Sequence, residues 1–100
     1  MSLLQPQSTD LTFFIEGSLD ALAVEIMRPR FDHLIDEQQN VVLDFSQVNF
    51  IDSSGIGAIV YLFKRLKAGN KRLTIQGAKG QPLELFRHLR IDKSISISAL

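Results

Sequence analysis

The chain has 100 residues, 45% of them hydrophobic and 22% charged, so it has the size of one globular domain with one core. It contains no cysteine, which excludes disulfides, thiolate catalysis and cysteine-ligated metal sites, and no apolar run is long enough for a transmembrane helix. Its formal net charge is zero, but nine acids and two arginines lie in residues 1–52, whereas nine bases and two acids lie in residues 53–100. Such opposite charges can steer a protein partner, and two solvated faces of one domain would carry them as well.

The first third of the chain is predicted to form a tail, a strand and a helix. Residues 1–10 are predicted to be a flexible polar tail, residues 11–15 (LTFFI) a strand buried on both faces, and residues 16–20 a turn. Asp20 is a plausible cap for a helix that reaches residue 35, whose apolar stripe comprises Ala23, Ile26, Met27, Phe31, Leu34 and Ile35. Pro29 lies inside this helix and removes a backbone hydrogen bond, so we expect a kink or an irregular first turn before it.

The middle of the chain changes from a strand period to a helix period. Residues 41–45 (VVLDF) are mostly β-branched or aromatic and predict a central strand. The helix predicted over residues 54–67 has an apolar stripe of Ile56, Ile59, Val60, Phe63 and Leu66. It is expected to stop at Gly69 or Asn70, either of which can adopt the left-handed backbone conformation.

The last third predicts a strand over residues 72–76, a helix with Pro82 in its first turn, and a strand over residues 95–98. Strands that alternate with helices predict one α/β domain with at least partly parallel strand pairing.

Few residues suit catalysis or metal binding. His33 and His88 are the only histidines, and Ile51 replaces the first glycine of a Gly-x-Ser-x-Gly nucleophile elbow. Val60 stands where a dinucleotide fingerprint requires its third glycine. We therefore predict no enzyme, no metal and no cofactor. An enzyme with Ser53 or Ser54 as its nucleophile is a rival that labelling with a fluorophosphonate would reveal.

Basic residues cluster between residues 64 and 72 (Lys64, Arg65, Lys67, Lys71 and Arg72). Cations suit the C-terminal end of a helix, which explains the cluster without a nucleic-acid partner. No nucleic-acid binding is predicted.

Three polar residues and a glycine, Asp52-Ser53-Ser54-Gly55, lie where the central strand gives way to the following helix. The unpaired N–H groups of a helix N-terminus need one capping residue, which contributes about 1 kcal/mol. Three successive capping residues followed by Gly-Ile-Gly exceed that need, so the segment is a candidate functional site.

The segment FIDSSGIG, residues 50–57, resembles the signature of STAS domains of the bacterial anti-sigma-factor antagonists. Residues 17–20 (GSLD) resemble that family's Gly-Glu-Leu-Asp turn, and the likeness extends over nearly all of residues 11–100. It implies a single STAS-like α/β domain over residues 11–100, with a mixed sheet of four or five strands and helices packed on it.

The resemblance also implies a function, that of a cytoplasmic, phosphorylation-switched binding module. The unphosphorylated protein would bind an anti-sigma serine kinase and so free a sigma factor. The kinase would phosphorylate Ser53, with Ser54 as the second candidate acceptor, and a PP2C-type phosphatase would restore binding. The implied docking surface comprises Asp20, Asp52, Ser54, Gly55, Ile56 and Gly57.

Two alternatives remain open. One is a STAS subunit of an ABC-type transporter complex that is never phosphorylated and does not itself insert into the membrane. The other keeps the kinase but directs the output to biofilm, motility or secretion control.

Overall fold

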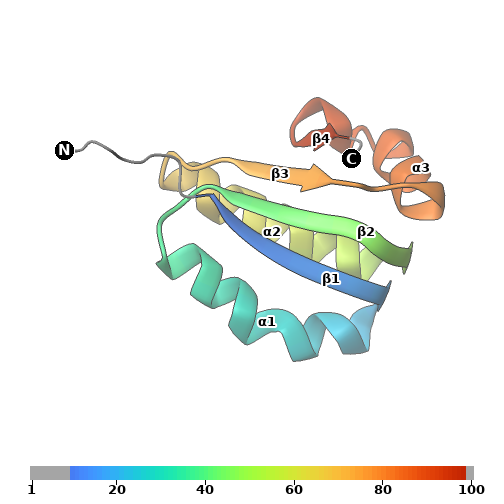
Figure 1. Ribbon diagram of the computed structural model, residues 1–100, viewed down its shortest axis with the longest axis horizontal. Helices are drawn as coiled ribbons and strands as arrows, with labels where there is room; N and C mark the ends of the chain where they lie inside the picture. The colour runs from blue at the N-terminus through green and yellow to red at the C-terminus, as the bar shows by residue number, and fades with distance from the viewer. Residues whose placement is uncertain (1–9, 99–100) are drawn as a thin grey trace.

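The computed structural model describes residues 10–98, which form one sheet of parallel strands joined by helices (Figure 1). The elements in chain order are β1 (Leu11–Leu19), α1 (Ala21–Asp36), β2 (Val41–Ile51), α2 (Ser53–Ala68), β3 (Leu73–Gln76), α3 (Gly80–His88), the 3-10 helix η1 (Ile91–Lys93) and β4 (Ser96–Ser98). The predicted element order is confirmed. The predicted tail lies outside the described residues except for Asp10.

Within residues 10–98 the sheet has four strands in the order β1-β2-β3-β4, and each neighbouring pair is parallel. The prediction of a mixed sheet is therefore wrong. A helical segment connects each strand to the next, and parallel neighbouring strands require crossover connections of this kind.

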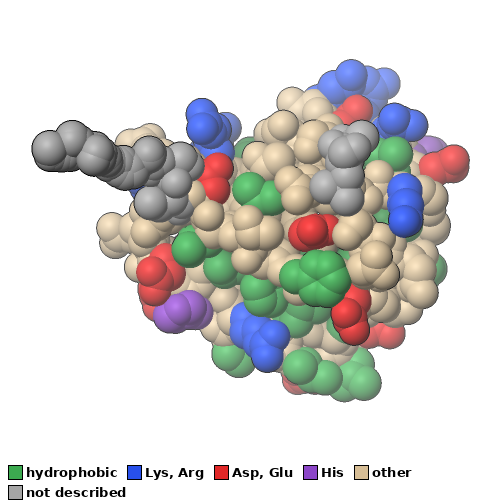
Figure 2. Space-filling model, in the orientation of Figure 1, with side chains coloured by type: hydrophobic (Ala, Val, Ile, Leu, Met, Phe, Trp, Pro, Cys, Tyr) green, Lys and Arg blue, Asp and Glu red, His purple; other side chains and the backbone are tan. Residues whose placement is uncertain are grey.

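One face of the sheet carries the core and the other is open. In β1, Ile15 and Leu19 point inward and are buried, whereas Phe14 points outward and is 52% exposed, so the predicted burial of both faces is wrong. On the inner face Phe45 packs 5.6 Å from Phe86 of α3, ring centre to ring centre. The open face is turned to the viewer in Figure 2, where hydrophobic and acidic side chains lie among polar side chains and backbone atoms.

Strand β1 continues to Leu19 through the segment in which a turn was predicted. The pairing of β1 with β2 shifts register between Phe14 and Glu16 and again between Gly17 and Ser18. Gly17 has a φ of +85°, a conformation that glycine adopts without steric cost. A bulge therefore absorbs the irregularity, and β1 reaches the same sheet edge as β2.

Helix α1 runs without interruption through Pro29, so the predicted irregular first turn is absent. Its buried residues are Phe31 and Leu34, and this packing outweighs the one hydrogen bond that the proline removes. Ile26, which was predicted to belong to the buried stripe, is 67% exposed.

The buried residues of α2 are Gly55, Ile59, Leu62 and Leu66, so its core-facing stripe is rotated from the predicted one. Val60 is only half-buried, and Leu62, absent from the prediction, is completely buried. The helix ends with Asn70 in the left-handed conformation, with a φ of 62°.

Candidate functional site

The candidate site lies at the carboxyl edge of the sheet, where β1 and β2 end side by side. Leu19 and Ile51 are paired at this edge, and the next residue of each strand, Asp20 or Asp52, precedes a helix. In open parallel sheets this edge is where ligands usually bind. The fold therefore brings together the two segments that sequence reasoning singled out separately.

Both aspartates cap helices in the same geometry. The Oδ1 atom of Asp20 accepts a hydrogen bond from the backbone N–H of Ala23 at 3.0 Å, and that of Asp52 accepts one from Gly55 at 3.1 Å. The cap predicted at Asp20 is confirmed, and of the three candidates for the second helix, Asp52, Ser53 and Ser54, it is Asp52 that caps α2. Each carboxylate thus fixes the start of a helix, and the half-buried side chains place two acidic groups at the edge.

The two serines are the first two residues of α2 and differ in exposure. Ser53 is exposed and Ser54 is half-buried, and neither hydroxyl has a hydrogen-bond partner among residues 10–98. The Ser53 hydroxyl is therefore accessible to a modifying enzyme or to a partner.

The two glycines of the segment serve different purposes. Gly55 is buried, and a Cβ atom there would lie 2.5 Å from the backbone oxygen of Leu19 and 2.6 Å from Cγ1 of Ile51. At Gly57 a Cβ atom would have no neighbour within 4 Å. Close packing against the strand ends explains Gly55, whereas nothing in the packing of the described residues explains Gly57. Ile56 lies between them, half-buried, and packs against the core.

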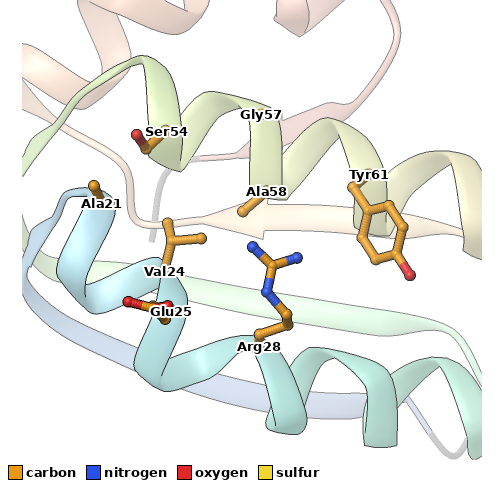
Figure 3. Close-up of a pocket in the computed structure, with 8 residues that line it drawn as sticks. All are labelled: Ala21, Val24, Glu25, Arg28, Ser54, Gly57, Ala58 and Tyr61. Atoms are coloured by element: carbon orange, nitrogen blue, oxygen red, sulfur yellow. The ribbon is translucent and has the colours of Figure 1, made fainter.

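A groove of about 490 Å³ runs between α1 and α2, starting at Ser54 (Figure 3). Its lining residues come equally from the two helices: Ala21, Val24, Glu25 and Arg28 from α1, and Ser54, Gly57, Ala58 and Tyr61 from α2. Small side chains make much of this lining, so the backbone of α2 is open to close approach.

Tyr61 is fixed at the end of the groove away from Ser54. Its hydroxyl accepts a hydrogen bond of 3.0 Å from Nη1 of Arg65, and the guanidinium carbon lies 5.7 Å from the ring centre. This anchored ring gives the groove a defined end.

Gln81 also supports the site, and sequence reasoning missed it. Its side chain accepts a hydrogen bond from the N–H of Ile51 and donates one to the carbonyl of Ile51, both at 2.9 Å. Strand β3 pairs with β2 only as far as Asp44, so the Gln81 amide replaces a neighbouring strand beside Ile51. Its partner is backbone 30 residues away, for which the sequence carries no local signal.

Neither histidine belongs to the site. His33 lies in the last turn of α1, where its Nε2 atom is 3.2 Å from a Glu37 carboxylate oxygen, and His88 ends α3. Both histidines thus lie in the last turn of a helix, whereas Ser53 and Ser54 lie in the first turn of α2. The nucleophile–base contact that a hydrolytic serine needs is therefore not assembled among the described residues.

A family model for the STAS domain matches residues 2–99. The chain belongs to the STAS domain family. This agrees with the resemblance seen in residues 50–57 and with the single α/β domain. Among residues 10–98, this STAS domain contains no helix that has both the length and the apolarity to cross a membrane.

Similar proteins include regulators and a transporter protein. The anti-sigma-B factor antagonist of Bacillus subtilis is 23% identical over 96 residues, which are 96% of this chain and 88% of the relative. The phosphorylated form of the Bacillus cell fate determinant SpoIIAA superposes with a TM-score of 0.70 at 20% identity, covering 96% of this chain and 88% of that one. A sulfate transporter family protein from Wolinella succinogenes gives 0.74 at 14% identity, covering 89% and 75%.

Proposed function

We propose that this STAS domain is a phosphorylation-switched anti-sigma-factor antagonist. In its unphosphorylated form it binds an anti-sigma serine kinase through the N-terminus of α2 and the adjoining groove. Ser53 is the phosphate acceptor, and the docking surface comprises Asp20, Asp52, Ser54, Ile56 and Gly57. Gly55, also predicted for this surface, is buried and instead lets α2 pack closely against the strand ends. The observation that carries the proposal is the Ser53 hydroxyl at the first residue of α2, which is exposed and has no hydrogen-bond partner within the described residues 10–98.

A phosphate at Ser53 has the physical properties of an off-switch. It adds about −1.5 to −2 charges next to the Asp52 carboxylate, on a surface that must lose water when a partner docks. A loss of only about 1.4 kcal/mol weakens binding tenfold. The N-terminus of a helix favours negative charge, so the phosphate should weaken partner binding without destabilising the fold.

The remaining parts of the proposal extend the resemblance to anti-sigma-factor antagonists. An antagonist of an anti-sigma factor works in the cytoplasm, where sigma factors act, and a PP2C-type phosphatase returns the domain to its binding form. The output is transcription or another process controlled by the same kinase. The B. subtilis relative, an anti-sigma-B factor antagonist, supports this assignment.

Phosphopeptide mass spectrometry of the protein from its native cells tests the acceptor. We expect one added phosphate on the peptide that contains both serines, lost in Ser53→Ala and retained in Ser54→Ala. Loss only in Ser54→Ala would assign the switch to Ser54. A protein without phosphate under every growth condition would contradict the proposal.

The alternative is a STAS subunit of an ABC-type transporter complex without phosphorylation. The fold shared with a sulfate transporter family protein favours keeping this candidate. It predicts that an ATP-binding cassette protein, and no serine kinase, co-purifies with the chain.

A further inference from the structure

A second hollow lies away from Ser53 and Ser54, at the amino ends of β3 and β4. Its volume is about 540 Å³, and its lining combines three cationic residues with three hydroxyls and two apolar residues: Lys67, Lys71, Arg72, Thr74, Ser94, Ser96, Phe63 and Leu73. We call these eight residues the basic hollow. The residues come from α2, β3, β4 and the segments that precede the two strands, so the fold assembles them from distant parts of the chain.

The backbone caps the end of α2, so the cations are not needed there as hydrogen-bond donors. At the end of α2 the N–H of Lys71 donates to the carbonyl of Leu66 at 2.8 Å, and the N–H of Asn70 donates to the carbonyl of Lys67 at 2.9 Å. Asn70 has the left-handed conformation, so the backbone closes the helix by itself in a Schellman motif. The carbonyls at this end therefore do not need the basic side chains as hydrogen-bond donors.

Within the part of the chain that the structure describes, the three cations also lack counter-charges. No acidic residue lines the basic hollow, and no ion pair among residues 10–98 includes Lys67, Lys71 or Arg72. Lys71 is half-buried, and the Lys67 ammonium lies 5.6 Å from the centre of the Phe63 ring. Three like charges gathered in one hollow repel one another, and an anion would relieve that repulsion.

The hydroxyl groups of the basic hollow suit phosphate oxygens. Thr74 and Ser96 are paired neighbours on β3 and β4 and offer O–H donors beside the cations. The backbone N–H of Arg72 donates to Oδ1 of Asn40 at 2.9 Å, which fixes the start of β3. Arginine and lysine form their strongest hydrogen bonds with charged phosphate oxygens.

We propose that the basic hollow binds a compact oligophosphate, either inorganic pyrophosphate or the diphosphate group of a small organic molecule. Three cations match the charge of a diphosphate better than that of a single phosphate. The volume of the hollow lies in the range of sites that bind small molecules. A nucleic-acid-binding surface can be flat and needs no such hollow. The site is independent of the proposed switch at Ser53.

Titration of the ¹⁵N-labelled chain with pyrophosphate, followed by NMR, tests this proposal. We expect saturable amide shifts confined to residues 67–74 and 94–96, and weaker binding of orthophosphate. Arg72→Gln should weaken pyrophosphate binding at least about tenfold, because it removes a charge-assisted contact. Lys79→Gln removes the same charge outside the hollow and should change binding less than about twofold.

Further measurements distinguish the ligand classes. Equal affinities for ADP and pyrophosphate would show that the site reads only phosphates, and tighter ADP binding would show that the organic part contributes; both support the proposal. Absence of saturable shifts, shifts elsewhere, or equal binding by Arg72→Gln and wild type would overturn it. Binding of an RNA oligonucleotide without binding of pyrophosphate would also overturn it. If Arg72→Gln loses its dispersed spectrum, Lys67→Gln replaces it.

Discussion

At the scale of single residues, two glycines in one helical turn predict stability changes of opposite sign. Gly55→Ala places a methyl group against the immobile backbone oxygen of Leu19 and should destabilise the domain by about 1–3 kcal/mol. Gly57→Ala enters open space in a helix and should stabilise it by up to about 1 kcal/mol. Urea unfolding of the two variants measures both effects. Destabilisation by both would show that the region around Gly57 is packed more tightly than the structure indicates.

A large side chain at Gly57 tests partner binding separately from stability. Gly57 lies in the groove, so Gly57→Leu should leave the fold intact. It should weaken the domain's affinity for the kinase that co-purifies with the wild-type protein at least about tenfold. The control is Leu22→Ala, which also changes the apolar surface, because Leu22 is an exposed residue of α1 that does not line the groove. Unchanged affinity in Gly57→Leu would remove the groove from the docking surface.

Asp44, on the open face of the sheet, predicts a pH dependence. The hydroxyl of Ser46 and the backbone N–H of Ser46, at 2.9 Å, donate to its carboxylate and lower its pKa below the ordinary value of 3.8. A lowered folded-state pKa adds stability above the unfolded-state pKa, and that stability is lost as the pH falls through the folded-state pKa. Thermal unfolding between about pH 5 and pH 2 should therefore show a smaller loss of stability in Asp44→Asn than in wild type. An identical pH dependence in both proteins would contradict this.

At the scale of elements, Gln81 links α3 to the end of β2. Gln81→Ala leaves the N–H and carbonyl of the buried Ile51 without these partners and should cost about 1–2 kcal/mol. Gln81→Glu keeps the acceptor but loses the donor, so it should fall between Ala and wild type. Gln47→Ala, on the exposed part of β2, should change the free energy of unfolding by less than about 0.5 kcal/mol. A neutral Gln81→Ala would show that water replaces the amide.

Sequence periodicity predicted the elements but not their ends or partners. The alternation of strands and helices was readable because each has its own apolar spacing. The continuation of β1 to Leu19 could not be predicted, because the residues of the bulge at Gly17 are also typical of a turn. Parallel pairing of every strand and the exposure of Ile26 depend on how elements pack, which local patterns do not encode. At the site, the capping aspartates were predictable from position, whereas Gln81 was not, because its partner is backbone far away in the sequence.

At the scale of the whole molecule, the two surfaces lie at opposite edges of the sheet. The serines and capping aspartates follow the carboxyl ends of β1 and β2, and the basic hollow lies at the amino ends of β3 and β4. Charged groups farther apart than the Debye length, about 8 Å at physiological ionic strength, are largely screened from each other. Phosphorylation of Ser53 should therefore leave pyrophosphate binding within about twofold of the unmodified protein.

In the proposed switch, a phosphate at Ser53 releases the partner. The most direct measurement is the affinity of the co-purified kinase for the wild-type domain before and after phosphorylation, with Ser53→Ala treated in parallel. We predict at least a tenfold loss for the wild type and no loss for Ser53→Ala. Equal affinity of the two wild-type forms, or the same loss in Ser53→Ala, would contradict the switch.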